Sequence, residues 1–100
     1  IIPRLNPSTF SIFMGKIGDT SVLNTPISVT IDEDGNILVL ENNPGRLVIF
    51  EPSGKNRIAI FSGLNYPENL NINPYDKSIF VTDSGNHRMA IYKRISNGVY

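Results

Sequence analysis

The chain of 100 residues contains no cysteine and no tryptophan, and its one histidine is His87. Without cysteine it has no disulfide bond and no thiolate ligand for a metal. A transition-metal site usually takes three or four protein ligands, so a single imidazole argues against one, and we expect neither a metal nor another cofactor. The same scarcity leaves few groups able to serve as a base or nucleophile, and we assign no catalytic residue.

Net charge is also absent, because nine Lys and Arg residues balance nine Asp and Glu residues. A neutral chain lacks the broad electrostatic attraction on which nucleic-acid affinity depends. RNA binding therefore remains only as a minor alternative, through a local basic patch of Lys55, Arg57, Arg88, Lys93 and Arg94. No apolar run approaches the length of a membrane-spanning helix, so we expect neither nucleic acid nor a membrane as a partner.

What the chain does contain is an internal repeat. Residues 23–26 (LNTP) return as residues 64–67 (LNYP), 41 positions later. One extra residue then enters the second copy, and the match continues at a spacing of 42. A period of this length is typical of modular folds whose units are stable only when they stack on neighbours. The other matching segments are 37–41 with 79–83, 46–50 with 88–92, and the Ile-Phe-x-Gly motifs at 12–15 and 60–63.

Each copy has the pattern of short β-strands. Stretches rich in β-branched and aromatic residues are separated by turn residues, as at Asp34-Gly35-Asn36. No window keeps a 3.6-residue apolar period, so we expect little or no helix. The predicted strands form two four-stranded sheets and are 9–14, 27–31, 37–41, 46–50, 57–62, 68–72, 78–83 and 88–92.

Residues 79–88 (IFVTDSGNHR) resemble the NHL repeat, a β-propeller blade. This second copy carries Asn86-His87-Arg88 at its turn, whereas the first keeps the Asp-Gly-Asn turn and has Pro44-Gly45 in place of Asn-His. The resemblance covers about residues 8 to 94. It implies an all-β fold, a β-propeller of NHL type with two four-stranded blade equivalents.

In the family's blade the proline-led strand lies innermost, next to the central channel, and the Ile-Phe-x-Gly strand lies outermost. The resemblance therefore implies that residues 1–100 form one two-blade propeller segment. Its parts are the outer strand of a preceding or neighbouring blade at 8–14, a complete blade at 26–62, an incomplete blade at 67–94, and the start of the next connection at 95–100. The strand at 8–14 is then free to complete the unfinished blade of a neighbouring subunit, which leaves no unpaired sheet edge.

A two-blade segment has apolar faces on both sides, whereas propellers have about four to eight blades. Leaving such a face exposed forgoes about as much free energy as holds a domain of this size together. We therefore expect the segment to belong to a six-bladed ring. Three copies of the chain form that ring in the preferred interpretation, since the strand count is a whole number of blades. In the alternative the chain is a fragment of a longer propeller.

The predicted function is that of a non-enzymatic scaffold that binds a protein or peptide through loops on one rim of the ring. The alternative is a propeller enzyme, or a site for a sugar or peptide, in the central channel beside Ser28, Thr30, Asn69 and Asn71. The predicted binding residues on the rim loops are Asn24, Asn43, Asn65, Tyr66, Asn86 and His87.

An acidic residue precedes an arginine by five positions once in each copy, as Glu41 with Arg46 and Asp83 with Arg88. Across a tight hairpin this spacing brings the two charges face to face, which predicts a structural ion pair at each turn. The acidic turn at 32–34 offers carboxylates to Ca²⁺, but acidic turns are most often simply solvated, and we predict solvation.

Overall fold

The computed structural model describes residues 23–95 and 99–100. This part of the chain is all β apart from one short 3₁₀ helix, η2 (Ser84–Asn86). No helix within it has the length and apolar character needed to cross a membrane. The strands are β1 (Pro26–Ile31), β2 (Ile37–Asn42), β3 (Gly45–Phe50), β4 (Arg57–Leu64), β5 (Pro67–Ile72), β6 (Ile79–Asp83) and β7 (Arg88–Tyr92).

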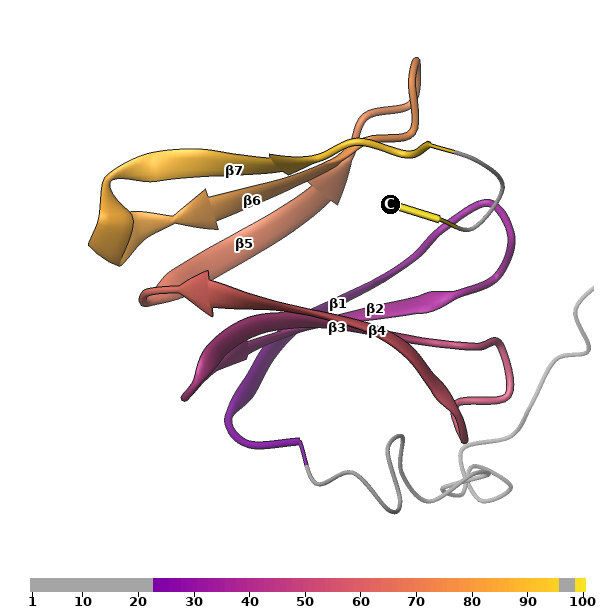
Figure 1. Cartoon of the computed structure of the whole chain (residues 1–100), viewed down its shortest axis with the longest axis horizontal. Helices are drawn as coiled ribbons and strands as arrows, with labels where there is room; N and C mark the ends of the chain where they lie inside the picture. The colour runs from indigo at the N-terminus through magenta and orange to yellow at the C-terminus, as the bar shows by residue number, and fades with distance from the viewer. Residues whose placement is uncertain (1–22, 96–98) are drawn as a thin grey trace, which may run out of the picture.

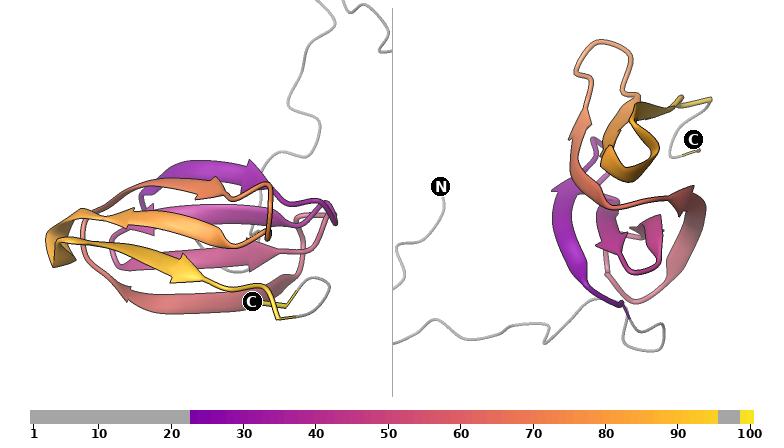
Figure 2. Two further views of the ribbon diagram at one scale, coloured as in Figure 1. Left: turned by 90° about the horizontal axis from the view of Figure 1, so that it is seen from above. Right: turned by 90° about the vertical axis from the view of Figure 1, so that its left-hand side faces the viewer.

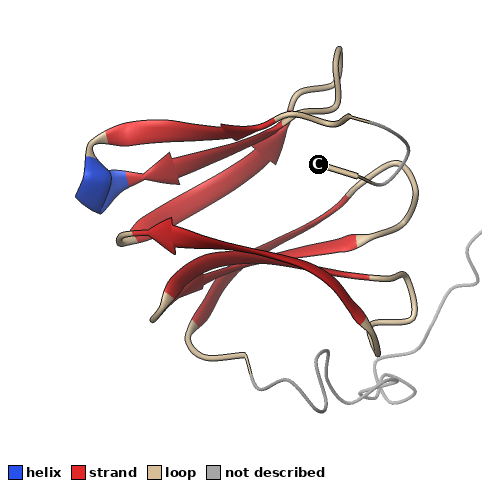
Figure 3. Ribbon diagram, viewed as in Figure 1, coloured by secondary structure: helices blue, strands red, loops and turns tan. Residues whose placement is uncertain are grey.

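The strands form two antiparallel sheets, each a simple meander (Figure 1). The first sheet has the order β1-β2-β3-β4, and the second has the order β5-β6-β7. The all-β prediction is confirmed, and strands and turns account for nearly all of the described chain (Figure 3). Each predicted strand that falls in the described residues is present within two residues of its predicted limits. The strand predicted at 9–14 lies outside them, and the second sheet has three described strands instead of four.

The two sheets repeat one another in geometry as well as in sequence. β1 and β5 both begin at a proline, and the register of each shifts directly after it, between Pro26 and Ser28 and between Pro67 and Asn69. Such a bulge bends a strand and increases its local twist. The two repeats therefore share an irregular feature, which shows that each segment has the same structural role in its own sheet.

The main core lies between the two sheets (Figures 1 and 2). Successive side chains of a strand point to opposite faces, so every second residue of the central strands faces the other sheet. Figure 2 shows the first strands of the two sheets, β1 and β5, beside each other, and they are in contact. The buried side chains of this core are Leu38, Leu40, Leu47, Ile49 and Leu64 from the first sheet and Leu70, Ile79 and Val81 from the second.

The first sheet is apolar on its other face too. Val29 and Ile31 of β1 pair with Val39 and Ile37 of β2 and therefore lie on this face, yet they are 59% and 56% exposed. We call it the back face of the first sheet. Its apolar side chains are Val29 and Ile31, the buried cluster Ile37, Val39, Val48 and Phe50, and Ile60 of β4, which pairs with Val48.

The second sheet is exposed on the side that points away from the first. Met89 and Ile91 of β7 are 52% and 49% exposed. Their equivalents in the first repeat, Leu47 and Ile49, are 0% and 1% exposed because the second sheet covers them. We call this uncovered side the front face of the second sheet. It consists of Asn69, Asn71, Phe80, Thr82, Met89 and Ile91.

Candidate interaction rim

Four loops meet at one end of the two sheets and form a rim, which is on the left in Figure 1. They are residues 23–25, 43–44, 65–66 and 84–87. Backbone hydrogen bonds tie them together in pairs, from the Asn42 N–H to the Thr25 carbonyl (3.0 Å) and from the Gly85 N–H to the Asn65 carbonyl (2.7 Å). The rim carries the six residues predicted as binding residues, Asn24, Asn43, Asn65, Tyr66, Asn86 and His87.

A buried carboxylate organises the first-repeat side of the rim. Glu41 lies directly opposite Arg46 in the β2–β3 hairpin, and its side chain is fully buried. The Arg46 guanidinium donates to Oε1, and the backbone N–H of Asn24 donates to Oε2. The predicted ion pair is confirmed, and it holds the loop that leads into β1 as well as the hairpin.

Asp83 has the same role in the second repeat. Its buried carboxylate accepts hydrogen bonds from the backbone N–H of Asn65 (2.7 Å), from the Asn86 amide (2.8 Å) and from the Arg88 guanidinium (2.7 Å). Burial opposes ionisation of this carboxyl, but these donors outweigh it and lower the pKa of Asp83 below its ordinary value. Since charge-assisted hydrogen bonds are strong, the second predicted ion pair is both present and well supported.

Two of the predicted binding residues are engaged in the architecture of the rim. Asn86 donates from its amide to the carbonyl of Gly63 (3.1 Å) as well as to Asp83, and Asn65 donates to the carbonyl of Gly85 (3.4 Å). The close approach of these loops requires glycine at position 85, because an added Cβ would lie 2.6 Å from the Asn65 carbonyl oxygen. These asparagines therefore position loops, and they present less free hydrogen-bonding capacity than their exposure suggests.

Tyr66 is the aromatic side chain of the rim. It is 68% exposed, and its backbone lies in the left-handed region (φ 45°). Thr25, its equivalent in the first repeat, has the same kind of backbone (φ 51°). Non-glycine residues rarely adopt this conformation, which costs about 1 kcal/mol or more unless the surroundings enforce it. The conformation recurs in both repeats at the residue that precedes the strand's first proline.

The first- and second-repeat loops enclose a pocket of about 510 Å³ at the rim. Its lining contains no charged side chain. Sequence reasoning marked the loops but did not single out Asn42, whose Oδ1 atom is buried and accepts no hydrogen bond from any described residue. We call this cavity the rim pocket. Its lining residues are Thr25, Asn42, Asn43, Pro44, Gly45, Leu64, Asn65 and Tyr66.

His87 lies outside this pocket, in the turn after η2. It takes a left-handed conformation (φ 53°), and its backbone N–H donates to the Ser84 carbonyl (3.0 Å). Within residues 23–95 and 99–100, no three His, Asp or Glu side chains are grouped so as to hold a metal ion. In this part of the chain His87 therefore caps a turn of the rim.

The polar residues suggested for a channel site do not share one face. Ser28 and Thr30 pair with Leu40 and Leu38, on the side of the first sheet that faces the second. Asn69 and Asn71 pair with Thr82 and Phe80, on the front face of the second sheet. The positions are equivalent in the two repeats, but the four side chains do not converge on one site within this chain.

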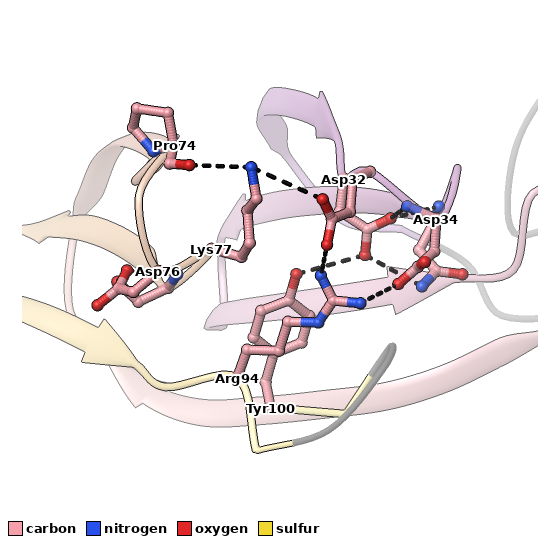
Figure 4. Close-up of polar contacts among 10 residues, drawn as sticks. Asp32, Asp34, Pro74, Asp76, Lys77, Arg94 and Tyr100 are labelled. Carbon is pink, nitrogen blue, oxygen red and sulfur yellow. Dashed lines mark hydrogen bonds and ion pairs between the residues drawn. The ribbon is translucent and has the colours of Figure 1, made fainter.

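The opposite rim contains a different cluster (Figure 4). Asp32 is buried there, and its Oδ1 accepts the backbone N–H groups of Asp34 and Asn36, both at 2.9 Å. The Arg94 guanidinium comes from the second repeat and pairs with Glu33 and with Asp34, the latter at 2.5 Å. The prediction of a simply solvated acidic turn is therefore wrong. The turn joins the two repeats because an arginine distant in sequence pairs with two of its three carboxylates.

Further contacts extend this junction. The Lys77 ammonium donates to the Pro74 carbonyl (2.9 Å) and lies 3.6 Å from Glu33. The Tyr100 hydroxyl donates to Asp32 (3.3 Å). Burial of the phenol and the neighbouring Asp32 charge raise the pKa of Tyr100 to about 12. The end of the chain is thus held against the first repeat.

Asp76 stabilises the longer turn of the second repeat. The Ser78 hydroxyl (2.7 Å) and the Ser78 backbone N–H (3.0 Å) both donate to its Oδ1, and together they lower the pKa of Asp76 to about 2. Lys93 lies 3.4 Å from its other oxygen. This turn contains the residue by which the second repeat is longer than the first.

No protein-family model matches the chain, and no curated protein matches it in sequence. The internal repeat, the exposed apolar side chains of β1 and β7 and the rim pocket are therefore the features from which a function is assigned.

Proposed function

We propose that this chain is a non-enzymatic interaction module made of two β-propeller blades of NHL type, and that copies of it assemble head to tail into a ring. The repeat, the meander of each sheet and the face-to-face packing of the two sheets support a stack of equivalent units. The rim loops are the surface on which the ring binds a protein or peptide.

The observation that carries this proposal is the mismatch between equivalent faces. Leu70 and Ile72 of β5 pack in the core between the sheets, whereas their equivalents Val29 and Ile31 are more than half exposed. The opposite sides of the sheets show the reverse. The side of the first sheet that carries Leu47 and Ile49 is covered by the second sheet, whereas Met89 and Ile91 on the front face of the second sheet are about half exposed. Among the described residues, the apolar side chains of β1 at one end and of β7 at the other thus lack the contact that their equivalents make inside the chain.

One further copy at each end covers these exposed side chains with the same sheet-on-sheet packing. The back face of one copy's first sheet then covers the front face of another copy's second sheet, as the two sheets cover each other within a chain. A contact between two different surfaces generates rings when its rotation closes. Three copies, which make six blades, form such a closed ring in this proposal.

A missing strand supports the same arrangement. β4 carries the Ile-Phe-x-Gly motif at 60–63 and covers the edge of β3, whereas β7 has no described strand on its outer side. The same motif stands at 12–15. In the ring, residues 8–14 of one copy pair with β7 of the next, so that each edge is satisfied.

The test uses two variants with one blocked face each. Ile31→Lys places a charge on the back face, and Ile91→Lys places one on the front face. Both side chains are about half exposed, so each variant is expected to fold. Each variant alone is expected to be monomeric, because its blocked face meets no partner. An equimolar mixture is expected to form a heterodimer, in which the intact front of one chain meets the intact back of the other.

Sedimentation velocity distinguishes the outcomes, with Tyr75→Lys as the matched control because Tyr75 is 93% exposed on a loop. The control is expected to assemble like the unmodified chain. If either blocked variant forms a homodimer by itself, or if the mixture remains monomeric, the head-to-tail contact is wrong.

A further inference from the structure

The contact between the two sheets of one chain is closed at the opposite rim by a cluster of ion pairs (Figure 4). The cations come from the second repeat and the carboxylates from the first. Arg94 pairs with Glu33 and Asp34, and Lys77 lies 3.6 Å from Glu33. We call these four residues the clasp. The internal repeat identifies the residue that stands at each equivalent position of the other repeat.

The two acidic positions of the clasp have neutral equivalents in the second repeat. Asp34 and Tyr75 are equivalent, because the backbone N–H of each donates to the side chain two residues earlier, at 2.9 Å in both turns. Glu33 then corresponds to Pro74. Pro74 is exposed, and Tyr75 is 93% exposed. The second sheet therefore presents a proline and a tyrosine where the first sheet presents two carboxylates.

The two basic positions likewise have neutral equivalents in the first repeat. Lys77 corresponds to Gly35, because both have a left-handed backbone (φ 64° and 84°) and both donate their N–H to the first carbonyl of the turn. Arg94 corresponds to Pro52, at the spacing of 42 that relates residues 46–50 to 88–92. Pro52 lies beside Gly35, where an added Cβ would be 3.4 Å from the proline ring. The first sheet therefore presents a proline and a glycine where the second presents two cations.

The head-to-tail contact brings these neutral groups together. Pro52 comes two residues after Phe50 of the back face. In the proposed ring this face of one copy covers the front face of another, with the packing that the two sheets have inside a chain. Pro52 is then placed opposite Tyr75 of the other copy, as Arg94 is placed opposite Asp34 within one chain.

We propose that the contact between copies is neutral at the point where the contact inside a chain is ionic, with Pro74 and Tyr75 of one copy facing Pro52 and Gly35 of the next. Affinity at this contact comes from the apolar faces, so salt has little effect on association. The ring opens and closes between copies, while the clasp holds the two sheets of each chain together. This inference rests on the proposed function, because the facing residues belong to a second copy.

The heterodimer of the Ile31→Lys and Ile91→Lys chains contains one such contact and is the sample for the test. The Ile31→Lys chain keeps its front face and receives Tyr75→Asp or Tyr75→Lys. The Ile91→Lys chain keeps its back face and receives Pro52→Arg. Sedimentation velocity over a series of concentrations gives the Kd of each combination.

Opposite charges at facing positions attract and like charges repel. Tyr75→Asp with Pro52→Arg is therefore expected to have a Kd about fivefold lower than Tyr75→Lys with Pro52→Arg at low salt. The difference is modest because the equivalent carboxylate, Asp34, is still 39% exposed in the clasp. In about 1 M salt it is expected to fall below about twofold.

The same position-75 variants without Pro52→Arg are the matched control. No introduced cation faces position 75 in that case, so their Kd values are expected to agree within about twofold. Both positions are exposed in turns, and the variants are expected to fold. The heterodimer without changes at positions 52 and 75 is expected to keep its Kd within about twofold between about 0.05 M and 1 M salt.

Failure of this inference is distinguishable from failure of the head-to-tail contact. A heterodimer that forms with equal Kd for both charge combinations, or one that dissociates steeply as salt rises, would overturn the neutral contact and leave the head-to-tail packing in place. If no combination forms a heterodimer, both proposals are overturned.

Discussion

At the scale of single residues, the buried carboxylates of Glu41 and Asp83 hold the rim loops in place. They stand at the ends of β2 and β6, at equivalent points of the two repeats, and neither is exposed. Each accepts a backbone N–H from the loop before its neighbouring strand. A buried carboxylate is costly unless it is paired and hydrogen-bonded. Each loop is therefore held in the position in which its N–H group donates to the carboxylate.

The two ion pairs differ in exposure, which predicts unequal effects of removing their arginines. Arg46 is 22% exposed, and its loss leaves Glu41 with one described donor, so Arg46→Ala is expected to lower the free energy of unfolding by about 3 kcal/mol. Arg88 is 55% exposed, and Asp83 keeps two other donors, so Arg88→Ala is expected to cost about 1 kcal/mol. Urea unfolding at one fixed chain concentration measures both, since association adds to apparent stability.

Arg57→Ala is the control for these variants, because Arg57 is an exposed strand residue. It is expected to change stability by less than about 0.5 kcal/mol. Equal effects of Arg46→Ala and Arg57→Ala would contradict a structural role for the Glu41 pair.

The lowered pKa of Asp83 predicts how stability depends on pH. A carboxyl whose pKa is lower in the folded state than in the unfolded state stabilises the fold above its ordinary pKa of 3.8, and this contribution is lost as the pH falls through the folded value. The difference in unfolding free energy between the unmodified chain and Asp83→Asn is therefore expected to be constant above about pH 5 and to shrink below about pH 4. A difference that grows on acidification would mean that the folded pKa is raised instead.

Residue-level predictions from the sequence succeed where the interaction is local. The two acid–arginine pairs could be predicted because a spacing of five across a short hairpin places them face to face. The acidic turn could not, because its partner Arg94 lies 60 residues from Asp34 along the chain. The unsatisfied Asn42 acceptor could not be predicted from the sequence either, since burial of a single atom depends on how two loops pack together.

At the scale of elements, strand positions could be read from the sequence with little error. Alternation of apolar residues and the turns at Asp34-Gly35-Asn36 and Pro44-Gly45 locate the hairpins, and tertiary packing moves their limits by at most two residues. The rim pocket, by contrast, could not be predicted from the sequence. It exists because the segment 64–66 passes close to the β2–β3 hairpin, and a strand pattern carries no information on that approach.

Gly45 provides the element-scale test of this approach. A Cβ at this position meets the backbone of Leu64, which cannot move without displacing β4, so Gly45→Ala is expected to lower the free energy of unfolding by about 2 kcal/mol. Gly63→Asn is the matched comparison. Gly63 has φ 90° with no atom within 4 Å of an added Cβ, and asparagine tolerates positive φ, so about 1 kcal/mol or less is expected. Urea unfolding measures both effects, and equal tolerance of the two substitutions would contradict the close packing.

At the scale of the whole molecule, the main feature is the exposed apolar surface on β1 and on β7. Exposed apolar side chains lie on β1 at one end and on β7 at the other, which are the places where the proposed ring puts a neighbouring copy. The sequence repeat predicts that the chain needs neighbouring units, and this stays a prediction. How the companions are supplied is a property of the assembly, and the proposed ring of three copies satisfies both faces and the open edge of β7 at once.

Sedimentation equilibrium of the unmodified chain, at concentrations from micromolar upward, measures the number of copies in the assembly most directly. The proposed ring predicts one species of about three times the 11.1 kDa chain mass, and this species should dissociate when Ile31→Lys or Ile91→Lys is introduced. A folded species of 11.1 kDa that stays monomeric across the whole concentration range would contradict it.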